Sequence, residues 1–255
     1  MEAVSKQLHK LIIELQSLPS LNDFVLAGGT CLALRFNHRI SHDIDLFSNK
    51  IVGESGIQTI AGELKSYFQN AILFCEIINT ESGNQYCFLR TLIVTEGFNI
   101  KVEIIQNIQF LNPAETFKEV RLLSLTDIGV MKLLSASSRK AKKDIYDLDF
   151  ITNEIPLARL LEYLNERTIK FNKEEHKCLF DLDNDPSPID DLALLLEFDN
   201  MNYSSLPGRP SHSTDRIEIL SHSKIWSAAR LSWIRKVKRL MKERGIDPPQ
   251  INPIN

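Results

Sequence analysis

Two short motifs near the beginning of the chain carry residue types that suit phosphate and metal chemistry. Gly28, Gly29 and Thr30 follow a short apolar run and precede a segment with helical spacing, which predicts a strand, a tight turn and a helix. Asp43 lies thirteen residues after Thr30, and the segment HDIDLF around it alternates charged and apolar residues, as β-strands do. Asp43 and Asp45 therefore share one face of the expected strand.

This pair of motifs predicts metal-assisted chemistry on a triphosphate. Two carboxylates on one strand face can ligate the same divalent ions, and oxygen ligands of this kind suit Mg²⁺ or Mn²⁺. Two such ions can clamp the attacking and leaving oxygens of an in-line displacement. The glycines let the backbone approach the phosphates, and the N-terminus of the following helix favours their negative charge.

A third carboxylate is expected from a neighbouring strand. Glu103 occupies the strand-like segment IKVEII, and Lys101 shares its face, so that face also carries a cation. Glu103 is interpreted as a metal ligand, and the equally good alternative is an exposed charge on an edge strand.

Further charged residues follow in a segment that is helical by its spacing. Lys132 precedes the basic run RKAKKD, and Asp144 and Asp147 lie three positions apart on one helix face. Lys132 could alternatively be a surface lysine, and Asp144 could simply stabilise the first turn of its helix. Tyr146 and Phe150 are expected in the core.

Together these segments resemble the AbiEii/AbiGii-type toxin nucleotidyltransferases, a branch of the DNA polymerase β-like superfamily. The resemblance is carried by LAGGTCLALRFNHRISHDIDLF at 26–47 and MKLLSASSRKAKKDIYDLDFI at 131–151. It implies phosphate contacts from the GGT turn and from Ser41, and metal binding by the two aspartates of the strand. It also implies that Glu103 is a metal ligand, at a position that is usually aspartate. Lys132 would contact the triphosphate, and Asp144 would orient a neighbouring group or the acceptor.

Membership of this family implies a toxin of a toxin–antitoxin or abortive-infection system. Such an enzyme would transfer NMP from an NTP to an acceptor hydroxyl with Mg²⁺ or Mn²⁺, and a tRNA or other RNA acceptor and a cognate antitoxin are the expected partners. One alternative is a small-molecule or protein nucleotidyltransferase of the antibiotic-modifying or AMP-transferring type. Another is an inactive relative that only binds nucleotide, although the intact GGT and DxD motifs argue against it.

The elements that must position these motifs predict an α+β fold. A mixed-sheet minimal nucleotidyltransferase core is expected over 1–118, and a helical domain with a basic C-terminal helix over 119–255. Helices are expected at 4–18 and 57–68, and strands at 71–79, 85–95 and 99–106. After Pro113 the pattern predicts no strand and only helices, at 125–137, 143–152, 157–168 and 193–201, with a mobile loop at 203–215.

The net charge of −3 conceals two segments of opposite sign. Residues 222–244 contain eight Lys or Arg and one acid, whereas residues 171–202 contain nine acids and two lysines. The basic segment has an apolar stripe at helical spacing, formed by Trp226, Ala229, Trp233, Val237 and Leu240. It is either a docked helix with a solvated basic face or a contact for the phosphate backbone of RNA.

Composition excludes several other classes of protein. The 255 residues, 43% of them hydrophobic, are enough for a packed core without disulfides or structural metal. The four cysteines have no CxxC spacing, the opening residues are too polar for a secretory leader, and no apolar run approaches the roughly 18 residues of a membrane span, so a cytoplasmic protein is expected. GxSxG and P-loop motifs are absent, and His38 and His42, which lack zinc-ligand spacing, are interpreted as loop residues that approach the substrate.

Overall fold

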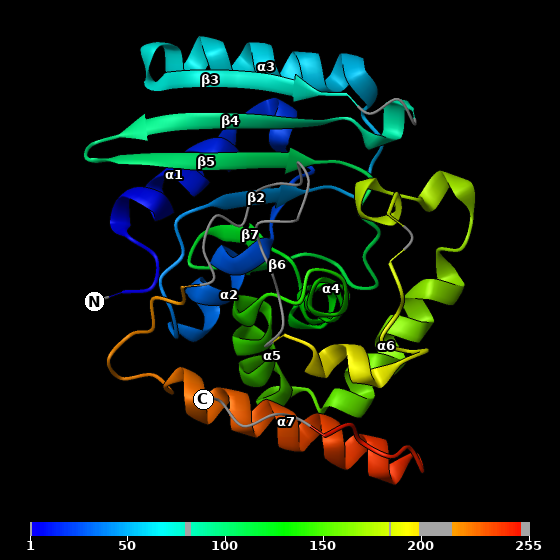
Figure 1. Cartoon of the computed structure of the whole chain (residues 1–255). Coiled ribbons are helices and arrows are strands. Elements are labelled where there is room, and N and C mark those ends of the chain that lie inside the picture. Colours follow the sequence, from blue (N-terminus) through cyan, green and yellow to red (C-terminus); the bar gives the residue numbers. More distant parts are fainter. Residues whose placement is uncertain (1, 80–82, 184, 199–215, 251–255) are drawn as a thin grey trace.

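The fold is built on one mixed sheet of seven strands in the order β3-β4-β5-β2-β1-β7-β6 (Figure 1). A computed structural model describes residues 2–79, 83–183, 185–198 and 216–250 of the chain. The strands are β1 Val25–Leu26, β2 Ile44–Phe47, β3 Ile72–Ile78, β4 Phe88–Thr95, β5 Phe98–Ile105, β6 Glu115–Phe117 and β7 Val120–Leu122.

Helices of the first half pack on this sheet, and helices of the second half gather beside its β1–β7 side. In Figure 1, α1 passes behind the strands and α3 runs along the β3 edge, whereas α4, α5, α6 and α7 lie below the sheet. The helices are α1 Lys6–Ser17, α2 Gly28–Phe36, α3 Gly53–Phe68, α4 Leu125–Ser138, α5 Lys142–Glu154, α6 Leu157–Lys170 and α7 Trp226–Glu243. The α+β fold class predicted from the sequence is confirmed.

The register of the central strands sets the chemistry that follows. Strand β2 runs parallel to β5 with Asp45 opposite Glu103, and β4 runs antiparallel to β5 with Arg90 opposite Glu103. Residues directly opposite each other on neighbouring strands point to the same face and lie close enough to interact. The side chains of Asp45, Glu103 and Arg90 therefore form one row across β2, β5 and β4.

One expectation about the second half is wrong, because two strands follow Pro113. Strands β6 and β7 form a hairpin, and β7 pairs in parallel with β1 through Leu26 and Leu122. Each has three residues, which is too short for a period-two pattern to be recognised. The hairpin spans residue 118, and the division into domains at that position stays a prediction.

The helices predicted after residue 124 are confirmed with one exception. The segment around Ala193 forms only the short 3₁₀ helix Leu192–Leu196 within the described residues. This segment has apolar residues on every side, and its leucines are buried. Its conformation is therefore set by tertiary packing and not by an amphipathic helical period. Residues 199–215, which include the end of the expected helix and the predicted loop, lie outside the described residues.

Helix α7 docks on the helical half through its apolar stripe. Ala229, Trp233, Val237 and Leu240 are buried, as the spacing predicts, and the Trp233 indole N–H donates to the carbonyl of Leu195 at 2.8 Å. No helix within the described ranges is both long and apolar enough to cross a membrane. All four cysteines are free thiols.

Candidate active site

The Gly28–Gly29 turn lies directly over the second aspartate of the DxD motif. Gly28 opens α2 with a φ of +62°, and a Cβ atom built on it would lie 1.8 Å from Asp45 Oδ2. A Cβ on Gly29 would lie 2.5 Å from a guanidinium nitrogen of Arg39. Only glycine combines a left-handed backbone with so close an approach of a neighbouring group. The turn therefore brings its bare backbone against one carboxylate and one guanidinium.

Thr30 and Ser41 fasten this turn to the DxD strand. Thr30 is buried, and its hydroxyl is hydrogen-bonded to the Ser41 hydroxyl at 2.8 Å and to the main-chain carbonyl of Asp43. Both side chains thus hold the approach to β2 in place. Phosphate binding by Thr30 and Ser41 remains a prediction, and in this structure the Thr30 hydroxyl is engaged inside the fold.

Three carboxylates gather on the sheet face beneath the turn. The Asp43 side chain is 52% exposed, Asp45 is partly buried, and Glu103 is 4% exposed. The pKa of Asp45 is raised to about 6, chiefly by burial and secondly by the negative charge of Glu103. The positive charge of Lys101 acts in the opposite direction and lowers this pKa. A carboxylate with a raised pKa gains from a nearby cation, because the cation stabilises its charged form.

Glu103 is a buried, ion-paired residue and not the exposed edge charge that was its alternative. Its Oε1 lies 2.8 Å from Arg90 Nε, and its Oε2 lies 3.4 Å from Lys101 Nζ. Lys101 Nζ also lies 3.7 Å from Asp43 Oδ2. The role of Glu103 as a metal ligand stays a prediction.

The donor set at Asp43 and Asp45 fits a divalent cation. Both offer hard carboxylate oxygens, and the missing side chain of Gly28 leaves room for the carboxylate of Asp45, which a Cβ there would displace. Within the described ranges, no group of three His, Cys, Asp or Glu side chains is placed to hold a metal ion. Metal binding by Asp43 and Asp45 rests on their oxygen donors and stays a prediction.

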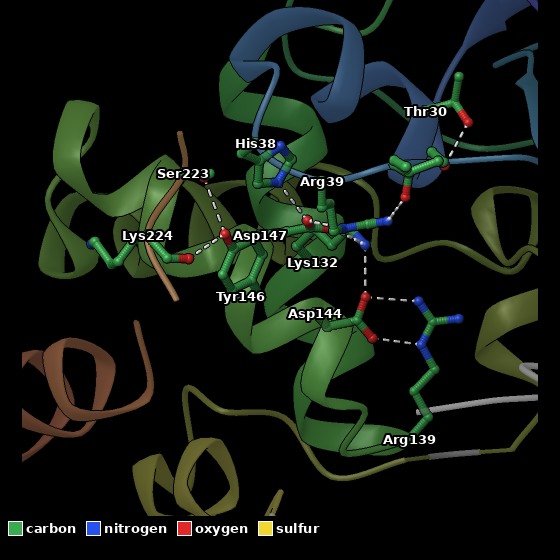
Figure 2. Close-up of polar contacts among 12 residues, drawn as sticks. Thr30, His38, Arg39, Lys132, Arg139, Asp144, Tyr146, Asp147, Ser223 and Lys224 are labelled. Atoms are coloured by element: carbon green, nitrogen blue, oxygen red, sulfur yellow. Dashed lines mark hydrogen bonds and ion pairs between the residues drawn. The ribbon is translucent and has the colours of Figure 1, made fainter. Parts of the chain in front are cut away.

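Beside the turn, α4 and α5 present a second, buried set of charges (Figure 2). Ser124 caps α4 by accepting from the Asp127 N–H, and Lys140, with a φ of +54°, turns the chain from α4 into α5. This turn places Lys132 of α4 against Asp144 and Asp147, which lie one helical turn apart on α5.

Lys132 is shared between the two aspartates. Its Nζ lies 2.7 Å from Asp144 Oδ1 and 2.8 Å from Asp147 Oδ2, and all three side chains are buried. Asp144 also binds Arg139 in a bidentate pair with distances of 2.6 and 2.9 Å. Asp147 binds Arg39 in the same way, at 2.7 and 2.8 Å. The surface position that was the alternative for Lys132 is wrong.

The cations decide the charge state of both acids. Burial alone would raise the pKa of Asp147, but Arg39 and Lys132 outweigh it and hold that pKa well below its usual range. Burial opposes ionisation of Asp144 too, and Arg139 with Lys132 lower its pKa. Both aspartates are therefore charged at neutral pH. They hold Lys132, Arg39, whose guanidinium lies against Gly29, and Arg139, whose charge acts on Asp45.

The histidines do not share one role. His38 is fully buried, its Nε2–H donates to Asp147 Oδ1 at 2.8 Å, and its ring stacks on Tyr146 with centroids 5.5 Å apart. It therefore supports Asp147 and does not approach a substrate, contrary to expectation. His42 is exposed, near Glu218. Tyr146 is in the core as predicted, whereas Phe150 is only partly buried.

Residues 216–224, which we call the C-terminal arm, hold the loop between α2 and β2. The Ile40 N–H donates to the carbonyl of Glu218 at 2.8 Å, and the Leu220 N–H donates to the carbonyl of His38 at 3.2 Å. The Tyr146 hydroxyl donates to the carbonyl of Lys224 at 2.6 Å (Figure 2). A segment far along the chain thus fixes the backbone on both sides of Arg39.

The sequence alone gives no role to three side chains of this site, Arg39, Arg90 and Arg139. Arg39 begins the RxS motif that ends at Ser41 and supports the interpretation of the DxD motif, and Arg139 opens the basic run RKAKKD. Arg90 lies in an ordinary strand, and only its register opposite Glu103 shows its role.

Comparisons with known proteins agree with this geometry. Residues 14–229 match the family described as nucleotidyl transferase AbiEii toxin, type IV TA system. An uncharacterized protein of Aquifex aeolicus (strain VF5) is 28% identical over 151 residues, covering 59% of this chain and 68% of that protein.

Two solved structures share the fold. One is a putative nucleotidyltransferase from H. pylori, with a TM-score of 0.51, 16% identity and 92% of each chain covered. The other is MenT4, a nucleotidyltransferase toxin from Mycobacterium tuberculosis, with a TM-score of 0.51 and 14% identity over 91% of this chain and 81% of that one. With a family match over most of its length, the chain belongs to the AbiEii nucleotidyl transferase toxins of type IV toxin–antitoxin systems.

Proposed function

We propose that this nucleotidyltransferase toxin transfers NMP from an NTP to a hydroxyl of RNA, with tRNA as the first acceptor to test and Mg²⁺ or Mn²⁺ as cofactor. The observation that supports the proposal is the contact between the bare Gly28 backbone and Asp45, because a turn suited to phosphate then lies beside a carboxylate suited to a metal ion.

The triphosphate would lie along Gly28 and Gly29 at the N-terminus of α2, where main-chain N–H groups favour anions. Asp43 and Asp45 would hold the metal, with Glu103 beside them. A divalent cation bound there would polarise the α-phosphate and offset the charge of the triphosphate.

The reaction is an in-line displacement at the α-phosphorus. The acceptor hydroxyl oxygen forms a bond to that phosphorus, the bond to the bridging oxygen breaks, pyrophosphate leaves, and the hydroxyl proton passes to water. Lys132 and Arg139 would oppose the triphosphate charge, and Arg139, whose side chain is 27% exposed, is the more accessible of the two. Asp144 binds both cations and acts as a positioning residue.

An RNA acceptor is supported by the outer face of α7. Some basic residues in and before α7 stabilise the fold. Lys236 and Lys224, which lies just before the helix, pair with the buried Asp149, and Arg230 is buried over the Phe198 ring. Others, among them Arg235, Arg239 and Lys242, remain at the exposed surface. Clustered exposed cations bind phosphate backbones with little sequence preference.

Incubation of the protein with each labelled NTP, Mg²⁺ and total tRNA tests the proposal. We expect label in tRNA from at least one NTP, and loss of that label in Asp43→Asn and Asp45→Asn. The matched control is Asp23→Asn, an exposed aspartate paired with Lys50 outside the site, which should label as the wild type does. Label in protein or in small molecules would refute the RNA acceptor.

A cognate antitoxin is part of the same proposal. Expression of the toxin alone should arrest growth, and expression of the adjacent reading frame should relieve the arrest. Growth arrest that survives in the Asp45→Asn variant would contradict an enzymatic toxin.

A further inference from the structure

Lys101 occupies a position between two of the three site carboxylates. Its Nζ lies 3.4 Å from Glu103 Oε2 and 3.7 Å from Asp43 Oδ2, and its side chain is 20% exposed. The parallel register of β2 and β5 pairs Asp45 with Glu103. Two residues earlier, Asp43 and Lys101 follow on the same side, because side chains alternate along each segment. Three carboxylates and one ammonium thus lie close together, with Asp45 beside Glu103 and Asp43 beside Lys101.

We infer that the Lys101 ammonium takes the place of a second divalent cation, so that this site works with one metal ion, held by Asp43 and Asp45. The inference rests on the proposed function. A second divalent ion, about 3.5–4 Å from the first, would need carboxylate oxygens of its own, and Glu103 is the nearby acid that could supply them. Here the group that joins Glu103 to Asp43 is the side chain of Lys101.

The partners of Glu103 support this assignment. Arg90 Nε donates to Glu103 Oε1 at 2.8 Å, and Lys101 Nζ donates to Oε2, so each oxygen already meets a cation. Arg90 and Lys101 both come from the β4–β5 hairpin, which is anchored by eight register pairs. Their side chains therefore start from a rigid part of the sheet and not from a loop.

The charges lead to the same conclusion. One divalent ion together with Lys101 and Arg90 supplies four positive charges, as many as two divalent ions would. A second ion beside Asp43 and Glu103 would have to approach the Lys101 ammonium closely, and like charges at such separations repel strongly where water is partly excluded. The ammonium is covalently tethered, so it remains in the site when metal is scarce.

Mn²⁺ binding tests the inference without reference to activity. The free Mn²⁺ signal in electron paramagnetic resonance is followed as the ion is titrated into protein saturated with each α,β-methylene nucleoside triphosphate in turn. Mn²⁺ bound by analogue that is free in solution is measured separately and subtracted. We expect about one Mn²⁺ per complex in the wild type and in Lys101→Arg, and about two in Lys101→Met, where Asp43 and Glu103 face each other without a cation.

Controls separate this inference from the proposed function. Lys10→Met replaces a lysine on α1 whose side chain is 78% exposed, and it should bind as the wild type does. Two Mn²⁺ in the wild type, or only one in a folded Lys101→Met protein, would overturn the inference. Unchanged Mn²⁺ binding in Asp45→Asn would instead remove the metal site of the proposed function.

Discussion

Gly28 and Asp45 are in such close contact that a single methyl group on Gly28 would come within 1.8 Å of Asp45 Oδ2. The two residues belong to different motifs, and the fold brings them together through the antiparallel pairing of β1 and β2, in which Leu26 lies opposite Leu46. The position of the carboxylate is thus set by the absence of a side chain on the turn.

Replacing Gly28 by Ala should therefore damage the site more than the fold. The alanine must adopt a φ of +62°, which costs about 1–2 kcal/mol, and its methyl group must push Asp45 aside. A displacement of about 1 Å can lower turnover by about 100-fold. Gly62→Ala is the matched control, because Gly62 lies within α3 with nothing within 4 Å of a Cβ, and it should gain about 1 kcal/mol of stability. Equal nucleotide transfer by both variants would contradict this reading.

Asp45 should make the metal-free protein less stable as the pH rises. Its pKa is raised to about 6 in the folded state from an unfolded value of 3.8, so the folded state binds the proton more tightly. The stabilisation from that proton is complete below about pH 4 and is lost as the pH rises through about 6, and it amounts to at most about 3 kcal/mol. Denaturant unfolding in EDTA should show Asp45→Asn more stable than wild type at pH 7.5 and equal to it near pH 4.

Divalent ions give a second measure of the same effect. Mg²⁺ should stabilise the wild type at pH 7.5 and leave Asp45→Asn unchanged, because the ion binds the charged carboxylate of the folded state. A stability difference between the two proteins that does not vary with pH would show that Asp45 is not the titrating group.

The shared position of Lys132 between Asp144 and Asp147 predicts a large cost for removing either acid. Asp147→Asn would leave Arg39 and Lys132 with too little negative charge in a buried position, which costs about 3–5 kcal/mol. The pKa of Asp147 is depressed, so its contribution is complete above about pH 4 and declines gradually as the pH falls from there towards the lower pKa of the folded state.

Unfolding curves of this variant between pH 3 and pH 7 provide the measurement. The wild type and Asp147→Asn should differ most at neutral pH, and the difference should begin to narrow as the pH falls below about 4. Asp23→Asn removes an exposed partner of Lys50 and should cost less than about 1 kcal/mol. An Asp147→Asn protein as stable as the wild type at pH 7 would contradict the proposed role of the network.

Two neighbouring cations on α7 should have separate roles: Lys236 should matter for stability, and Arg235 should matter for RNA binding. Lys236 Nζ contacts Asp149, Thr152 and Asn153 at 2.8 to 2.9 Å, so Lys236→Met should lower stability by about 3 kcal/mol and leave RNA affinity unchanged. Arg235 is exposed, and Arg235→Gln should leave stability within about 0.5 kcal/mol of the wild type.

Salt dependence distinguishes these two roles. The slope of log affinity for tRNA against log salt should fall by about 1 for Arg235→Gln and stay constant for Lys236→Met. Equal slopes in wild type and Arg235→Gln would remove this face of α7 from the RNA interface.

The sequence by itself determined the features that lie within a single strand, turn or helix. The spacing of Gly28 and Gly29, the alternation around Asp43 and Asp45, and the apolar stripe of α7 each follow from the geometry of one element. The fold class and the proposed metal ligands could therefore be predicted before any tertiary contact was known.

Only the tertiary structure decided how the charges are paired. Arg39 and Asp147 are 108 residues apart, and Arg90 meets Glu103 through a strand register that no spacing encodes. On α7, Lys236 is held by Asp149 of α5, whereas its neighbour Arg235 is exposed. A buried charge is tolerated only where a distant partner offsets its lost hydration, and such partners are chosen by packing and not by sequence period.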